Sequence, residues 1–237
     1  MEENKVYRHR MTTRIDVLDK GFVELQDWMG DDNAIVSAAR VSFLGDSKGA
    51  EKDEKLIKYL MEHKHTTPFE MVELKFKIKC PIFIARQWQR HRSFHYMSVN
   101  EVSRRYTSEE IDFYIPNEIR GQHKNSKQCS SEDGLDVDIQ NSFISLIKED
   151  TETLYAHYLK LIEFGVAREQ ARMILPQNMY TTFICKGDLH NFLHFVSLRA
   201  DIHAQKEMRE YANAIFEYIK ERTPIAAEYA VSFGIVK

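Results

Sequence analysis

Cysteine is scarce in this sequence of 237 residues. The three cysteines are Cys80, Cys129 and Cys185, and no two of them form a Cys-x-x-Cys pair. No apolar run approaches the length of about 18 residues that a membrane span needs, and the polar N-terminus lacks the apolar middle of a signal peptide. These absences argue against a disulfide-stabilised secreted protein. They predict a cytoplasmic protein with reduced thiols and no membrane association.

A large excess of positive charge is also missing. Lys and Arg total 33 against 36 Asp and Glu, and the formal charge of −3 argues against a dedicated nucleic-acid binder. The sequence has neither GxGxxG nor GxxxxGK[ST], so any bound phosphate would be held by side chains rather than by a glycine loop. The ordinary composition, with 43% hydrophobic residues, predicts a single globular domain over residues 1–237.

Against this balance, one stretch is rich in arginine. Residues 86–106 (RQWQRHRSFHYMSVNEVSRRY) hold five arginines, no lysine and a single acidic residue, Glu101. A guanidinium donates two parallel hydrogen bonds to a phosphate or carboxylate and stays charged when partly desolvated. The polar and aromatic residues among the arginines suit a ring with several hydrogen-bonding edges. The stretch therefore predicts a site for a phosphate-bearing small ligand, with a solvated basic face or an RNA-binding patch as the alternatives.

Hydrophobic periodicity predicts an α/β fold of the α+β type, with a small antiparallel sheet flanked by several long helices. A hairpin of two short strands is expected over 14–25. Val72, Leu74, Phe76 and Ile78 alternate with charged residues, which predicts a half-buried strand. Helices are expected over 34–41, 52–64, 82–92, 139–164, 167–175, 189–199 (capped by Asp188) and 204–221.

The remaining segments are expected to be less regular. Residues 180–185 form a β-rich stretch, and residues 113–116 are expected to be an edge strand or an extended segment. A turn is expected at Asn100 and Glu101. Residues 1–12 are expected to be flexible, and the polar segment 120–138 to be an exposed loop.

Two pairs of histidines have a spacing that can chelate a metal on a helix, namely His91 with His95 and His190 with His194. Neither pair has the glutamate of an HExxH motif, and no nearby carboxylate completes a metal triad. We therefore favour histidines that face a core or a ligand and expect no metal, with a metalloenzyme as the alternative.

Two further residue types bear on the chemistry. Cys80 and Cys185 end predicted strands, with no acid or base paired to them in the sequence, which favours buried structural thiols over nucleophiles. Arg199 ends an apolar helix, where an arginine is costly to desolvate unless it meets an anion.

Several blocks of the sequence together resemble the flavin-dependent thymidylate synthases, the ThyX family. In chain order they are HxTPFE at 65–70, RQWxRHR and NExSxRY within the arginine stretch, RMILP at 172–176, DLHN at 188–191 and LRxDxHAQ at 198–205. The resemblance implies a homotetramer with active sites at subunit interfaces. It also implies transfer of the methylene group of 5,10-methylenetetrahydrofolate to C5 of dUMP, giving dTMP. FAD reduced by NADPH would supply the hydride, without a cysteine nucleophile.

The same resemblance implies the site residues. The expected FAD contacts are Thr67, Arg90, His91, Arg92, Asn100, Glu101, Asp188, His190 and His194, with His65 and His203 as neighbours. The expected dUMP contacts are Gln87, Arg90, Glu101, Ser103, Arg104, Arg105, Arg172 and Arg199. Arg199 is expected to be catalytic, because a fixed cation lowers the pKa of the uracil N3–H and makes C5 more nucleophilic.

One departure from the family signature lies in the arginine stretch. Ten residues separate Arg92 from Ser103, where the family usually has seven. We interpret the difference as a three-residue insertion within 93–99, beside the expected flavin site.

Overall fold

A five-stranded antiparallel sheet organises the computed structural model, which describes residues 14–42, 45–91, 100–103, 111–125 and 130–236. In spatial order the strands are β1 (Arg14–Val17), β2 (Gly21–Met29), β3 (Glu73–Pro81), β7 (Tyr180–Asp188) and β4 (Asn100–Glu101). The expected fold class, helices combined with a small antiparallel sheet, is confirmed, as is the hairpin predicted over 14–25.

The central strand β3 shows how the sequence pattern creates one buried face. Its apolar side chains are no more than 1% exposed, whereas the lysines between them stand on the other face; the buried ones are Leu74, Phe76, Ile78 and Cys80. This is the alternation that a half-buried strand requires. β3 pairs with β7 along its whole length.

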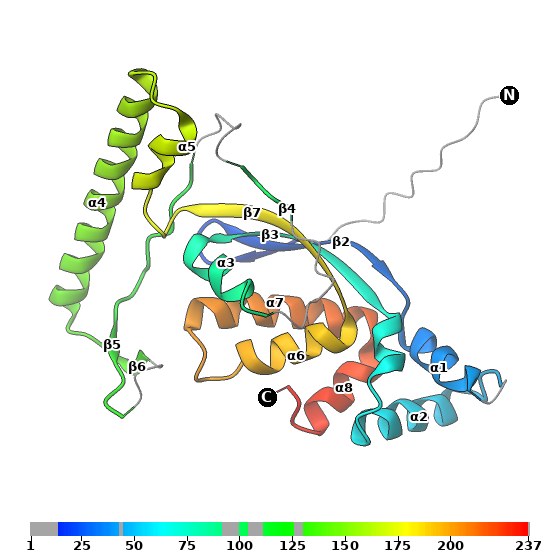
Figure 1. Cartoon of the computed structure of the whole chain (residues 1–237). Helices are drawn as coiled ribbons and strands as arrows, with labels where there is room; N and C mark the ends of the chain where they lie inside the picture. Colours follow the sequence, from blue (N-terminus) through cyan, green and yellow to red (C-terminus); the bar gives the residue numbers. More distant parts are fainter. Residues whose placement is uncertain (1–13, 43–44, 92–99, 104–110, 126–129, 237) are drawn as a thin grey trace, which may run out of the picture.

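Two helices cover the buried face of the sheet, α6 (Leu189–Arg199) and α7 (Lys206–Arg222) (Figure 1). A third helix, α8 (Pro224–Ser232), packs against α7 and α2. Phe76 of β3 meets the ring of Phe192 of α6 edge-on, with 5.1 Å between ring centroids. The Tyr218 hydroxyl of α7 donates to the Val23 carbonyl oxygen over 3.1 Å. These contacts fix the position of α6, which carries several of the expected site residues.

The two ends of the sheet differ. At one end the 3₁₀ helix η1 (Thr67–Met71) contacts β7 and packs against α1 (Asp32–Val41), which in turn packs against α2 (Ala50–Glu62). At the other end stands the long helix α4 (Val137–Glu163), together with α5 (Arg168–Ala171) and the 3₁₀ helix η2 (Arg172–Ile174) (Figure 1). Between the sheet and α6 lies the short helix α3 (Ile82–Trp88). No helix in the described part of the chain is both long enough and apolar enough to cross a membrane.

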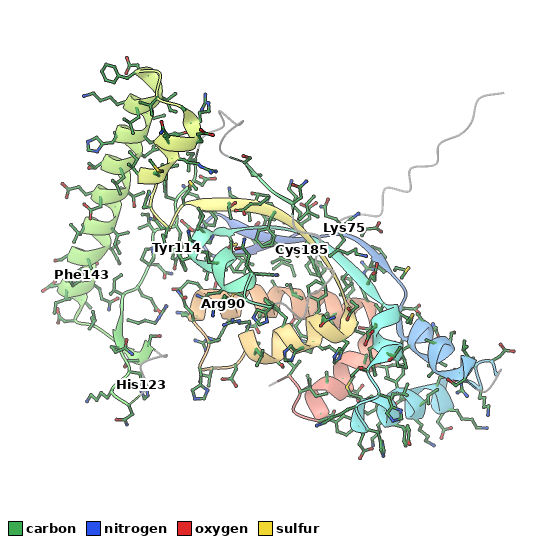
Figure 2. All side chains as sticks on the ribbon, in the orientation of Figure 1. Lys75, Arg90, Tyr114, His123, Phe143 and Cys185 are labelled. Atoms are coloured by element: carbon green, nitrogen blue, oxygen red, sulfur yellow. The ribbon has the colours of Figure 1, made fainter. Side chains whose placement is uncertain are left out.

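Large apolar side chains remain exposed on and around α4. They are Val137, Ile139, Phe143, Leu146, Leu159, Phe164 and Met173, with Met173 76% exposed. Figure 2 shows Phe143 on the outer side of α4. A small cluster that includes Phe113, Tyr158 and Met179 joins the other side of α4 to the rest of the chain.

The structure corrects several predicted boundaries. The segment predicted as a loop, 120–138, contains β5 (Arg120–Gln122), β6 (Ser130–Gly134) and the start of α4, and the two strands pair with each other. The predicted turn at Asn100 and Glu101 is β4, which pairs with Ile184 and Phe183 of β7. In each case the hydrogen-bond partner lies elsewhere in the chain, so the local pattern does not reveal it. Residues 1–12 lie outside the described residues.

Helix ends also differ from the prediction. The helix expected over 82–92 ends at Trp88, and the one expected over 167–175 divides into α5 and η2. The sequence pattern did not predict α8. That helix begins where the buried Asp32 side chain accepts hydrogen bonds from the backbone N–H groups of Ile225 and Ala226, each over 3.0 Å.

Candidate active site

Four of the expected site residues gather along α6, and we call them the α6 cluster: His91, His190, His194 and Arg199. Asp188 caps the helix, since its side chain accepts from the backbone N–H of Asn191 over 2.9 Å, as the sequence predicted. Because α6 begins directly after Asp188, His190 and His194 lie one helical turn apart and line the same cavity. Arg199 is the last residue of the helix.

Arg199 is held by a histidine rather than by a carboxylate. Its Nε donates to Nε2 of His91 over 2.6 Å. The His91 ring is 8% exposed and meets Phe195 edge-on. Burial, together with the positive charge of Arg199 and the proximity of His194, lowers the pKa of His91 to about 4. His91 is therefore neutral near pH 7 and orients the guanidinium without cancelling its charge.

Further positive charge lies near this pair. Burial lowers the pKa of Arg199, and the positive charge of Arg90 adds to the effect. Figure 2 shows Arg90 close to the end of α3, on the side of α6 and α7. Two guanidinium groups near each other favour an anion between them.

A cavity of about 240 Å³, which we call the α6 cavity, lies between α6 and the segment that joins α2 to η1. Its apolar walls include Leu60, Phe69 and Leu193, and its polar lining includes His65, Thr66, His190 and His194. Whole small-molecule sites usually enclose roughly 300–1,000 Å³, so this cavity suits the planar ring of a larger ligand rather than all of it. Thr67 is the exposed residue next to this lining.

A second cavity, of about 920 Å³, lies beside β4. We call it the β4 pocket and define it by Arg86, Glu101, Ser103 and Arg172 of its lining. Glu101 is fixed there, because its Oε1 accepts from the buried Thr181 hydroxyl over 2.6 Å. Within the described ranges, the side chains of Arg86 and Arg172 have no hydrogen-bond or ion-pair partner. Two guanidinium groups beside a serine hydroxyl suit a phosphate monoester, and Glu101 and Glu169 are the carboxylates of the same lining.

The structure thus brings the expected residues together in two groups. The α6 cavity and the β4 pocket share no lining residue. Asn100 is exposed on β4, and Gln87 of α3 hydrogen-bonds to Gln205. His203 is exposed, and its ring lies 2.7 Å from a carboxylate oxygen of Asp201. The expected residues Arg92, Arg104 and Arg105 lie outside the described residues, as does the insertion expected within 93–99.

Arg86 is the residue that the sequence comparison missed. It belongs to the arginine stretch, but the family motif assigned it no ligand. Its place on α3, beside a pocket that also contains Arg172, makes it a candidate ligand contact.

Cys80 and Cys185, the two cysteines among the described residues, line neither cavity. Cys80 and Cys185 are fully buried, and burial raises the pKa of both thiols. The prediction that they are structural is therefore confirmed, because a buried thiol with a raised pKa is a poor nucleophile. Across the described residues, no group of three or more His, Cys, Asp or Glu side chains is arranged to hold a metal ion.

Comparison with known proteins shows the family. Residues 24–225 match the family described as thymidylate synthase complementing protein. A flavin-dependent thymidylate synthase of Thermus thermophilus is 52% identical over 212 residues, which cover 90% of this chain and 76% of the relative. The enzyme of the same name from Wolbachia pipientis wMel is 49% identical over 219 residues, 92% of this chain and 76% of the relative.

A solved structure supports the same assignment. The UMP/dUMP methylase PolB from Streptomyces cacaoi, bound with 5-Br dUMP, superposes with a TM-score of 0.82 at 29% sequence identity. The alignment covers 94% of this chain and 99% of that chain. This protein therefore belongs to the thymidylate synthase complementing protein family, the flavin-dependent thymidylate synthases that its sequence blocks resemble.

Proposed function

We propose that this protein is an FAD-dependent thymidylate synthase whose single catalytic domain spans residues 1–237. It methylates C5 of dUMP to give dTMP, with 5,10-methylenetetrahydrofolate as the carbon donor and NADPH-reduced FAD as the hydride source. The family match over residues 24–225, with relatives named for this reaction, is the observation that carries the proposal. The likeness to a methylase of UMP and dUMP supports a uracil nucleotide as the substrate.

The α6 cavity fits the ring of a flavin. Its apolar walls suit the faces of the ring, and the histidines of the α6 cluster supply polar contacts at its edges. Arg90 supplies charge for the diphosphate, and the other proposed contacts are Thr67, Arg92, Asn100, Glu101 and Asp188. The two Asp188 carboxylate oxygens already accept hydrogen bonds from Asn191, so a contact with FAD would use their remaining lone pairs. When bound and reduced, FAD supplies the hydride of the reaction.

The β4 pocket fits the phosphate of dUMP. Ser103 and Arg172 lie there as the family motif implied, and Arg86 adds a second guanidinium. We assign the remaining dUMP contacts to Gln87, Arg90, Glu101, Arg104, Arg105 and Arg199.

Arg199 then acts on the uracil ring. A cation held near N3 lowers the pKa of the N3–H and stabilises the negative charge that makes C5 nucleophilic. The neutral His91 holds Arg199 in one orientation, so little reorganisation is needed at the moment of reaction. Neither Cys80 nor Cys185 can attack C6 of the ring from the core, which agrees with a mechanism that uses no cysteine nucleophile.

We also propose that the active site forms between copies of the chain, in a homotetramer. The α6 cavity and the β4 pocket share no lining residue within one chain, and a homotetramer would place the β4 pocket of one copy against the α6 cluster of another. Exposed apolar side chains support such an interface, both on α4 and at Met173, which lines the β4 pocket.

The absorption spectrum of the purified protein tests the cofactor and the substrate together. We expect a flavin spectrum that bleaches when NADPH is added without oxygen, faster or more completely with dUMP present. Methylenetetrahydrofolate should then yield dTMP. A colourless protein that takes up no added FAD would contradict the proposal. Steeply salt-dependent binding to long RNA would instead favour a nucleic-acid function.

A further inference from the structure

A chain of hydrogen bonds runs from the candidate site to a buried ion pair. Gln87 Nε2 of α3 donates to Gln205 Oε1, just before α7. Gln205 Nε2 donates to Glu207 Oε2 over 2.9 Å. Arg120 Nη2 lies 2.7 Å and 2.9 Å from the two oxygens of the same carboxylate. Four residues from three distant parts of the sequence therefore form one network.

The chemistry of the carboxylate gives this network a direction. An ionised carboxylate only accepts hydrogen bonds, so Gln205 must turn its NH₂ group towards Glu207. Its carbonyl oxygen then faces Gln87, which must turn its own NH₂ group towards Gln205. The Gln87 carbonyl oxygen is left facing away from the network. Nowhere in the described parts of the chain does a donor contact that oxygen.

The anchor of the network is well fixed. Glu207 is 5% exposed, and Arg120 is also largely buried. Burial by itself would raise the pKa of Glu207, but the hydrogen bonds and charge of Arg120 outweigh burial and hold it below its ordinary value. Glu207 therefore stays ionised at neutral pH and remains a pure acceptor.

We infer that Arg120, Glu207 and Gln205 are positioning residues that orient the Gln87 amide, so that its carbonyl oxygen accepts a hydrogen bond from dUMP. This inference rests on the proposed function, in which Gln87 contacts dUMP. A half-buried carbonyl oxygen that meets no donor among the described residues favours a ligand that supplies one, and dUMP has donors in its uracil N3–H and its deoxyribose 3′-hydroxyl.

Substitutions that reverse the donor and acceptor directions of the network test the inference. The measured quantity is the Kd of the FAD-loaded protein for dUMP, determined by calorimetry. Glu207→Gln can donate to Gln205, which removes the fixed direction, and the Kd for dUMP should rise about tenfold. Gln87→Glu should also weaken binding, because two acceptors then face each other at Gln205. In the double variant Glu207→Gln with Gln87→Glu, both bonds of Gln205 can form in the reverse direction while residue 87 still offers an acceptor, and Arg120 can still donate to the amide oxygen of residue 207. Its Kd should return to within about threefold of wild type.

A control and a second variant keep the test decisive. Glu210→Gln removes the same charge from α7 outside the network, and it should leave the Kd unchanged. Should Glu207→Gln fail to fold, Gln205→Leu deletes the two glutamine bonds without touching the ion pair, and it should raise the Kd about tenfold.

The outcomes separate the inference from the proposed function. Additive losses in the double variant would overturn the inference, as would an unchanged Kd in Glu207→Gln or in Gln205→Leu. If wild-type protein loaded with FAD does not bind dUMP at all, the proposed function itself has failed.

Discussion

The α6 cluster and the β4 pocket handle positive charge in opposite ways. In the α6 cluster, the Arg199 guanidinium already has a partner in the buried ring of His91, and both lie against a helix that packs on the central sheet. In the β4 pocket, Arg86 and Arg172 are exposed and have no partner among the residues that the structure describes. The α6 cluster is organised before any ligand arrives, whereas the two arginine side chains of the β4 pocket form no ion pair with a described residue, although Glu101 and Glu169 belong to the same lining.

This difference suits the roles that we propose for the two regions. A group that stabilises charge during a reaction is most effective when its orientation is fixed in advance. A group that binds a phosphate can gain its partner on binding, and its affinity comes from charge-assisted hydrogen bonds made at that moment. The half that we propose for catalysis is therefore partly buried and already hydrogen-bonded, and the half that we propose for phosphate binding has exposed arginines.

The largest predicted effect follows from a substitution in the α6 cluster. Arg199→Ala removes the cation proposed to act on the uracil ring, and kcat for dTMP formation should fall about 10²–10³-fold or more. Counting dTMP formed per bound flavin by chromatography measures this loss, and the melting temperature and flavin spectrum should stay close to wild type. Turnover within a few-fold of wild type would remove Arg199 from the chemistry.

Lowering the pH should destabilise the folded protein through His91, which belongs to the α6 cluster and not to the β4 pocket. The unfolded chain binds a proton at His91 near pH 6.5, whereas the folded chain does so only near pH 4. Between these values acid favours the unfolded state, so His91 alone should lower the free energy of unfolding by about 3 kcal/mol as pH falls from 6.5 to 4.

His91→Gln is the matched variant for this prediction. Glutamine can still accept from Arg199 but does not titrate, so the variant should lose that part of the pH dependence. Urea unfolding curves at several pH values measure the difference, and identical pH profiles in the two proteins would contradict the low pKa of His91.

A substitution in the β4 pocket should have a smaller effect than the loss of Arg199. Arg172→Ala removes one charge-assisted contact to the phosphate, which is worth about 1.5–3 kcal/mol, so the Kd for dUMP should rise roughly 10–150-fold. Because kcat at saturating dUMP should change much less, steady-state kinetics can separate binding from chemistry. Arg168→Ala, in the same short helical segment but outside the pocket lining, should leave the Kd near wild type.

The smallest effect tests whether the two halves meet between copies of the chain. Arg199→Ala and Arg172→Ala chains, co-expressed with different tags, should form mixed oligomers in which some sites combine two intact halves. With random assembly, activity at low dUMP should recover to about one quarter of wild type. No recovery in purified mixed oligomers would place both halves of each site in one chain.

Local sequence patterns predicted the elements that depend on near neighbours. The alternation in β3 was visible because one face of that strand is apolar along its length. The cap at Asp188 was visible because its hydrogen bonds reach only three residues along the chain. The motif blocks likewise identified the family, and with it most of the candidate site residues.

Contacts between distant residues could not be predicted in the same way. The predicted turn at Asn100 and Glu101 is a strand because β7 supplies its partners, and the predicted loop over 120–138 contains Arg120, which pairs with Glu207. α8 begins at a cap supplied by Asp32, 193 residues before the amide of Ile225.

The sequence by itself therefore determined the class of the fold, the burial of Cys80 and Cys185 and the set of arginines and histidines available for a site. Only the tertiary structure decided how that set is divided. His91 meets Arg199 across 108 residues of chain, and Gln87 meets Gln205 across 118. The reason is physical: periodicity reports which face of an element is buried, whereas the partner of a polar group depends on which distant element packs against that face.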